Sequence, residues 1–182
     1  MINPVSESVM ETRPVFQQFK VVGVDTVLIY TDFMSMKYAE NSPLMNSAGF
    51  IANDFAVFLN HASGLQPVRI RFHAGGSDFI ANCNIALDSE IVISPEDYLP
   101  NGDNLSWWGA NESYDAYDSL ANNTPPVSGI NYNYGQQRTT HIIEWAVHHL
   151  PIDSNRIYLD GSSFGSIGAY FYAMTFPEKI AA

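Results

Sequence analysis

The sequence predicts an α/β protein, a three-layer sandwich in which a mostly parallel sheet lies between helices. Three observations lead to this prediction. Runs rich in β-branched residues recur along the 182-residue chain, and the later ones alternate with segments of helical period. Hydrophobic residues make up 46% of the chain and charged residues 15%, as in an ordinary globular protein. We expect one domain over 1–182, with 1–48 as an N-terminal segment that holds the first strands.

Four segments in the first half of the chain have strand character. The segment 68–76 ends in glycines, and 89–95 is an apolar run stopped by Pro95, typical of a strand buried on both faces. The predicted strand regions are 19–33, which holds a strand or two, 54–60, 68–76 and 89–95.

The segment 96–135 has a different composition. It is dense in Asn, Asp, Ser, Gly, Pro and aromatic residues and has no sustained period. We expect a long loop over one end of the sheet, with a short helix near 113–120. Loops of this length in compact domains are usually functional or mobile.

The remaining elements alternate. The segment 136–150 has apolar residues at helical spacing and is followed by Pro151, which ends a helix. The next strand is predicted at 156–160, and a second helix at 163–176 is stopped by Pro177. This alternation favours a parallel arrangement of the late strands.

The turn between that strand and the second helix carries the main functional signal. Gly161-Ser162-Ser163-Phe164-Gly165 fits the pattern G-x-S-x-G in a strand–turn–helix context. A sharp turn would project the hydroxyl of Ser163 above the sheet, and the flanking glycines would prevent collisions. The alternative is a simple Gly/Ser connection in which a serine caps the helix.

A second glycine-rich turn follows an earlier strand. The sequence RFHAGGS, 71–77, places Gly75 and Gly76 where a backbone N–H could face a substrate oxygen. A plain tight turn is the alternative. A phosphate-binding loop is disfavoured, because the following residues include no lysine.

These segments resemble the N-terminal part of an α/β-hydrolase. The resemblance covers roughly 50–182 and points to the secreted esterase, polyhydroxyalkanoate-depolymerase and prolyl-oligopeptidase-like group. It implies that Ser163 is the nucleophile and that the N–H of Phe164 is one oxyanion donor. It implies a second donor in the loop, Gly75 or Gly76, and the alanine at position 74, where many relatives have glycine, leaves that choice open.

The chain departs from the family's pattern in the acid and the histidine that should follow the nucleophile. The family's order is nucleophile, then acid, then histidine, but after Ser163 the chain has one acidic residue, Glu178, and no histidine. We therefore expect a C-terminally incomplete hydrolase domain. His73 is the nearest alternative base, although the resemblance implies a structural role for it, in ordering the loop. All five histidines precede the serine: His61, His73, His141, His148 and His149.

Substrate and partners follow from weaker signals. Trp107 and Trp108 are predicted to line a pocket for a small-molecule or polymeric ester, and packing of the loop is the alternative. The net charge of −11 disfavours nucleic acid. No apolar run is long enough to span a membrane. We expect no cofactor and no metal, since Glu112, Asp115 and Asp118 lack an EF-hand pattern and fit a solvated face.

Two other functions stay open. A prolyl-oligopeptidase-like peptidase would share the serine turn, and a binding protein with a hydrolase fold could have lost catalysis. The resemblance implies a secreted or periplasmic location, although the first twenty residues show no signal-peptide pattern.

The missing base leads to a first prediction. The 182-residue chain by itself is expected to hydrolyse p-nitrophenyl acetate or butyrate little or not at all, because a serine without its base is a poor nucleophile. Purified chain and its Ser163→Ala variant are compared in a spectrophotometric assay. A robust rate that Ser163→Ala abolishes would contradict the expectation of an incomplete domain.

Overall fold

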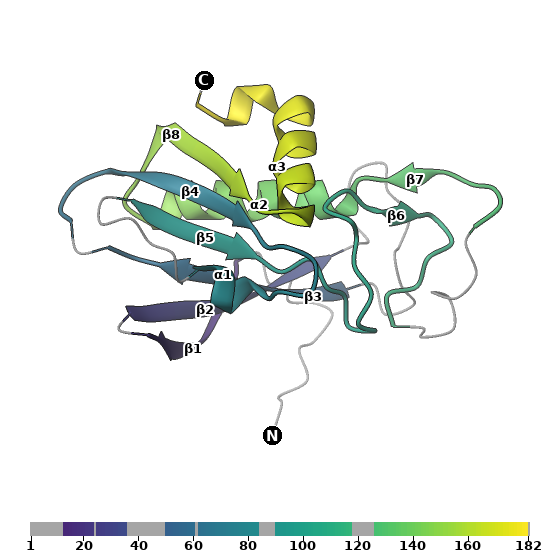
Figure 1. Cartoon of the computed structure of the whole chain (residues 1–182), viewed down its shortest axis with the longest axis horizontal. Helices are drawn as coiled ribbons and strands as arrows, with labels where there is room; N and C mark the ends of the chain where they lie inside the picture. Colours follow the sequence, from purple (N-terminus) through teal and green to yellow (C-terminus); the bar gives the residue numbers. More distant parts are fainter. Residues whose placement is uncertain are drawn as a thin grey trace.

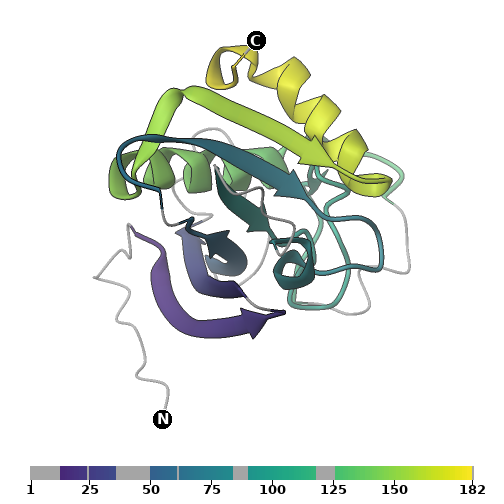
Figure 2. The same ribbon diagram turned by 60° about the vertical axis from the view of Figure 1, so that its left-hand side comes forward.

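The computed structural model describes residues 13–23, 25–35, 50–60, 62–83, 90–117 and 126–181 (Figure 1). Its main feature is a six-stranded sheet with the order β1-β2-β3-β5-β4-β8. Figure 2 shows β1 and β8 at opposite edges of this sheet. The strands are β1 (Val15–Val22), β2 (Asp25–Ser35), β3 (Phe50–Phe58), β4 (Gln66–Phe72), β5 (Ile91–Pro95) and β8 (Ile152–Gly161).

The sheet is mixed rather than mostly parallel. The pairings β1–β2, β2–β3 and β3–β5 are antiparallel, whereas β4 pairs in parallel with both β5 and β8. The late alternation of strands and helices therefore predicts the direction of β5, β4 and β8 correctly. Only two residues separate β1 from β2, a hairpin connection that favours their antiparallel pairing.

Helices lie on both faces of the sheet, so the three-layer α/β prediction is confirmed. The helices are α1 (Phe79–Cys83), α2 (Tyr134–His149), α3 (Phe164–Thr175) and the short 3-10 helix η2 (Pro177–Lys179). Figure 1 shows α1 in front of the sheet and α2 behind it. The core confirms this, because Val92 of β5 packs with α1, while its neighbours Ile91 and Ile93 pack with α2 and α3.

The larger core joins α2 and α3 to the sheet. It contains Ile70 and Phe72 of β4, Ile142 of α2, and Tyr172 of α3, all almost fully buried. Trp107 fills the space between them. Its ring lies so close to Gly168 of α3 that a Cβ at that glycine would collide with it. Only glycine at position 168 lets this helix pack against the indole.

The described residues 96–117 and 126–133 lie beyond the carboxyl ends of β4, β5 and β8 (Figure 1). They contain a two-stranded sheet, β6 (Ala110–Asn111) with β7 (Asn131–Tyr132), that the sequence pattern does not reveal. The short helix expected near 113–120 is absent from 113–117, and 118–120 lie outside the described residues. Such brief pairing depends on side-chain hydrogen bonds, such as those of Asn111, rather than on periodicity.

Two strand boundaries differ from the sequence-based ones. The strand predicted at 68–76 ends at Phe72, so His73 and the glycines lie in the loop. The strand predicted at 156–160 begins earlier, at Ile152, because Gln66 of β4 pairs with that residue. In the described ranges, no helix has both the length and the apolar character needed to cross a membrane.

Candidate active site

Ser163 occupies the turn that links β8 to α3 in an unusual backbone conformation. Its φ is 53° and its ψ is −117°, a region that costs a non-glycine residue of order 1–3 kcal/mol. It stands at the N-cap position of α3, yet its side chain makes no capping hydrogen bond. The helix-cap alternative therefore does not explain the serine, and its side chain is exposed.

Two glycines leave room for this turn. A Cβ at Gly161 would overlap the carbonyl of Gly165, and a Cβ at Gly165 would overlap the carbonyl oxygen of Phe72. The first turn of α3 thus rests directly on the end of β4. The close contacts of Gly161 and Gly165 with neighbouring backbone atoms hold this turn in place, so Ser163 keeps its positive φ.

The glycine loop, residues 73–77 after β4, lies beside the serine turn, residues 161–165. A Cβ built on Gly75 would lie 3.8 Å from the Cβ of Phe164, so the two segments are in contact. Ser77 donates its N–H to the carbonyl of Ala74, which closes a β-turn, and Gly76 has a φ of +76°, as position i+2 of a type II turn requires.

The backbone N–H groups near the serine differ in what they bind. The N–H of Gly76 donates to the hydroxyl oxygen of Tyr98 at 3.0 Å. Among the residues that the structure describes, the N–H groups of Gly75 and Phe164 form no hydrogen bond. The N–H groups of Gly75 and Phe164 are therefore available to a ligand, whereas the N–H of Gly76 is bound to Tyr98.

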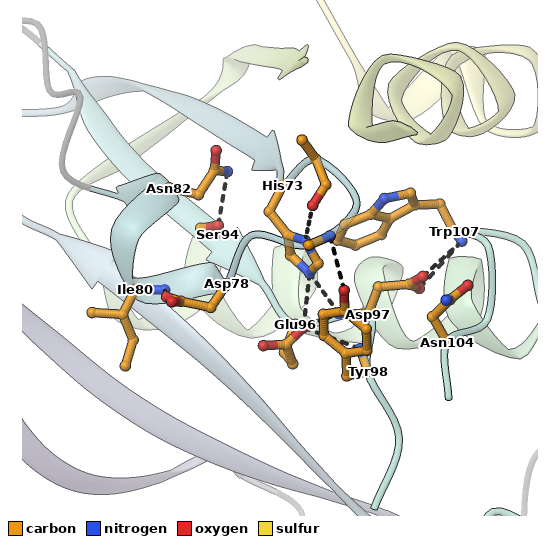
Figure 3. Close-up of polar contacts among 12 residues, drawn as sticks. His73, Asp78, Ile80, Asn82, Ser94, Glu96, Asp97, Tyr98, Asn104 and Trp107 are labelled. Carbon is orange, nitrogen blue, oxygen red and sulfur yellow. Dashed lines mark hydrogen bonds and ion pairs between the residues drawn. The ribbon is translucent and has the colours of Figure 1, made fainter. Parts of the chain in front are cut away.

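His73 lies at the end of β4 and is buried, with 1% of its surface exposed. Its Nδ1 lies 2.9 Å from the carbonyl oxygen of Ala74, and its Nε2 lies 2.7 Å from Oε1 of Glu96 (Figure 3). Burial alone would lower the pKa of His73, but the hydrogen bonds to Glu96 and Ala74 and the charges of Glu96 and Asp97 raise it. Nε2 also lies 3.1 Å from the backbone nitrogen of Asp97, so both ring nitrogens are engaged and His73 ties the loop to the residues that follow β5.

A buried pair that no sequence motif reveals supports the same region. The carboxylate of Asp97 accepts the N–H of Trp107 at both oxygens and lies 3.5 Å from Nη2 of Arg138 on α2. Burial raises the pKa of Asp97 despite the opposing charge of Arg138, and burial lowers the pKa of Arg138. The only sequence signal is the position of Glu96 and Asp97 immediately after β5, at the edge where β4 also ends.

The two tryptophans of the predicted pocket have different environments. Trp107 is 2% exposed and packs edge-on against Phe72 and His73, so it is a core residue and not a pocket wall. The sequence cannot distinguish two adjacent tryptophans, because the difference arises from contacts with distant residues. Trp108 is 39% exposed, and its ring lies 6.1 Å from that of Phe171 on α3.

The remaining histidines and acidic residues lie elsewhere. His141 pairs with Asp32 through Nδ1 at 2.8 Å, and His61 lies outside the described residues. A hollow of about 470 Å³ on α2 includes none of the predicted site residues; it is lined by Arg13, His141, Glu144, Trp145, His148, His149 and Lys179. Within the described ranges, no three metal-ligating side chains come together, and Asp118 of the acidic loop lies outside those ranges.

The comparison with solved structures supports the fold. No protein family's sequence profile and no curated sequence matches the chain. Similar solved structures include an S-formylglutathione hydrolase from Agrobacterium tumefaciens (TM-score 0.56, 13% identity, 91% of this chain and 58% of that one). A thermostable esterase is also similar (TM-score 0.50, 15% identity, 96% of this chain and 54% of that one). So is the fluorophosphonate-binding serine hydrolase F of Staphylococcus aureus (TM-score 0.51, 13% identity, 84% of this chain and 53% of that one).

This chain spans little more than half the length of each of those structures. At such low identities the likeness shows the fold, which is of the α/β-hydrolase type, as the resemblance implies. It does not single out the secreted esterase, depolymerase or oligopeptidase-like group within that fold.

The close packing of Gly165 in α3 against the end of β4 leads to a stability prediction. Gly165→Ala is expected to lower the free energy of unfolding by about 3 kcal/mol, because the methyl group has to push backbone atoms apart. Gly75→Ala is the matched control, and it is expected to cost less than about 1 kcal/mol because its Cβ would make an ordinary contact. Urea unfolding of both variants measures the difference. Equal losses would contradict the close approach of Gly165 to β4.

The raised pKa of His73 leads to a prediction of pH dependence. The contribution of His73 to the free energy of unfolding is fully present below about pH 6.5, the pKa of histidine in the unfolded chain. It is lost as the pH rises through the raised pKa of His73 in the folded protein. The free energy of unfolding is therefore expected to fall from pH 6 towards alkaline pH, measured in a His141→Gln background because the pKa of His141 is also raised. Glu96→Gln is expected to lower the pKa of His73 in an NMR titration, and an unchanged value would rule out the ion pair.

Proposed function

We propose that the protein is a serine hydrolase that cleaves carboxylic esters through an acyl-enzyme. The observation that carries this proposal is the backbone of Ser163, which holds a positive φ on an exposed turn between strand and helix. Strain of this kind in a non-glycine residue is retained at functional sites more often than elsewhere. The unused hydroxyl of Ser163 and the glycine loop beside it support the same role.

In the proposed reaction, Oγ of Ser163 attacks the ester carbonyl while its proton passes to a base. The carbonyl oxygen becomes an oxyanion that accepts hydrogen bonds from the N–H groups of Phe164 and Gly75. Preorganised donors of this kind are worth several kcal/mol in the transition state. The alcohol leaves with a proton, and water then hydrolyses the acyl-serine. We propose Gly75 rather than Gly76, because the N–H of Gly76 is bound to Tyr98.

The proposed reaction also needs a base. His73 is unsuited to it, because its ring is buried and both ring nitrogens are already engaged. A general base has to reach the serine hydroxyl directly or through one water molecule. We therefore propose that the base is a histidine other than His73, oriented by a carboxylate.

The choice of an ester substrate has its own support. Two of the similar structures are named as an esterase and as an S-formylglutathione hydrolase. Trp108 and Phe171 present exposed aromatic edges beside α3, suited to contact an apolar acyl or aryl group. No cofactor enters the proposed chemistry. A peptidase of the same fold remains the second candidate, because it would use the same serine turn.

The proposal leads to a test on the full-length protein. A fluorophosphonate probe is expected to label the wild type at Ser163 and to leave Ser163→Ala unlabelled, because only an activated serine attacks phosphorus. Ser162→Ala is the matched control and should keep its labelling. Peptide mapping identifies the modified residue, and labelling that persists in Ser163→Ala would refute the assignment.

Two further outcomes separate the alternatives. Faster turnover of p-nitrophenyl esters than of peptidyl anilides supports the ester hydrolase, and the reverse order supports the peptidase. A full-length protein that folds but takes up no probe and turns over neither substrate would favour the non-catalytic binding function.

A further inference from the structure

The glycine loop after β4 contains a peptide group that can face either of two ways. Ala74 and Ser77 close the turn, so Gly75 and Gly76 occupy its two central positions. Type I and type II turns differ by a flip of the peptide between these positions. With glycine at both, the backbone itself distinguishes weakly between the two forms, since glycine adopts either sign of φ. An outside contact is therefore needed to select one.

Tyr98 supplies that contact. Its hydroxyl oxygen accepts the N–H of Gly76 at 3.0 Å, and Gly76 has the positive φ of a type II turn. In a type I turn, position i+2 has a φ near −90°, and the same N–H would point elsewhere. Among the described residues, this is the one hydrogen bond that the central peptide N–H of the loop makes.

The tyrosine itself is held firmly. Its backbone N–H donates to Oε1 of Glu96 at 3.0 Å, and its backbone bridges to Asn104. Its ring stacks on the buried imidazole of His73, with centroids 5.6 Å apart and an interplanar angle of 18°. Figure 3 shows the Tyr98 ring beside His73 and close to Glu96. Since Glu96 binds both His73 and Tyr98, the ends of β4 and β5 position the hydroxyl jointly.

We propose that Tyr98 is a positioning residue whose hydroxyl holds the central peptide of the loop in the type II orientation and thereby fixes the loop that presents the N–H of Gly75 to the oxyanion. This inference rests on the proposed function for its catalytic meaning. The hydroxyl touches no reacting atom in this scheme. It acts through Gly76, and its effect is on the transition state, because the oxyanion does not exist in the bound ester.

The test uses Tyr98→Phe, which removes the hydroxyl and keeps the ring stack on His73. Amide exchange of Gly76, followed by NMR, is expected to become about fivefold faster, as for the loss of one ordinary hydrogen bond. In the full-length protein, kcat for a p-nitrophenyl ester is expected to fall about tenfold while KM stays within about twofold. A merely structural role would not separate kcat from KM in this way.

Tyr158→Phe is the matched control. Tyr158 lies on β8 and is 40% exposed. Removal of its hydroxyl is expected to change neither the amide exchange of Gly76 nor kcat. Unchanged exchange of Gly76 in Tyr98→Phe would overturn the contact. Faster exchange with unchanged kcat would overturn the positioning role.

Failure of the proposed function looks different. A wild-type protein without activity and without labelling at Ser163 would overturn the hydrolase assignment. The exchange of Gly76, which needs no catalysis, would still decide whether Tyr98 holds the peptide.

Discussion

The contact between Gly165 and the end of β4 is the constraint on which the rest of the site depends. Because no Cβ intervenes, the first turn of α3 rests against the carbonyl of Phe72. This approach leaves β8 no room for a gradual turn into the helix, and Ser163 takes the strained conformation that results. The same approach sets Phe164 against Gly75, so one backbone contact both exposes the serine and brings the glycine loop to it.

Beneath that contact, charged groups hold the carboxyl ends of the strands together. Glu96 binds His73, and Asp97 binds the backbone of Trp107 and faces Arg138, with Asp97 and Arg138 almost completely buried. Buried charges are costly unless they are paired and hydrogen-bonded. Their concentration at one edge indicates that this edge is kept rigid, which a site built from loops requires. Trp107 itself is held at a positive φ, so the strain in this region is not limited to the serine.

Sequence reasoning succeeds where one local pattern dictates the structure. The helix period of α2, the apolar run of β5 and the glycines around Ser163 each determine an element, whereas no such pattern indicates α1, the helix on the other face of the sheet. It fails where long-range contacts decide. The burial of Trp107 next to the exposed Trp108 depends on Phe72 and α3, and the hydrogen bond of the Gly76 N–H depends on Tyr98, 22 residues away in the sequence. The antiparallel pairing of β1 with β2 likewise reflects the two-residue connection between them rather than their composition.

The fit of Trp107 against Gly168 has a consequence for how this protein can change over time. A methyl group at position 168 would enter the space of the indole, and a smaller side chain at 107 would leave a void beside Phe72. Neither substitution is neutral alone, whereas the two together exchange volume across the same interface. Positions 107 and 168 should therefore change as a pair in descendants of this chain, so that an alanine at 168 is accompanied by a smaller ring or an aliphatic residue at 107.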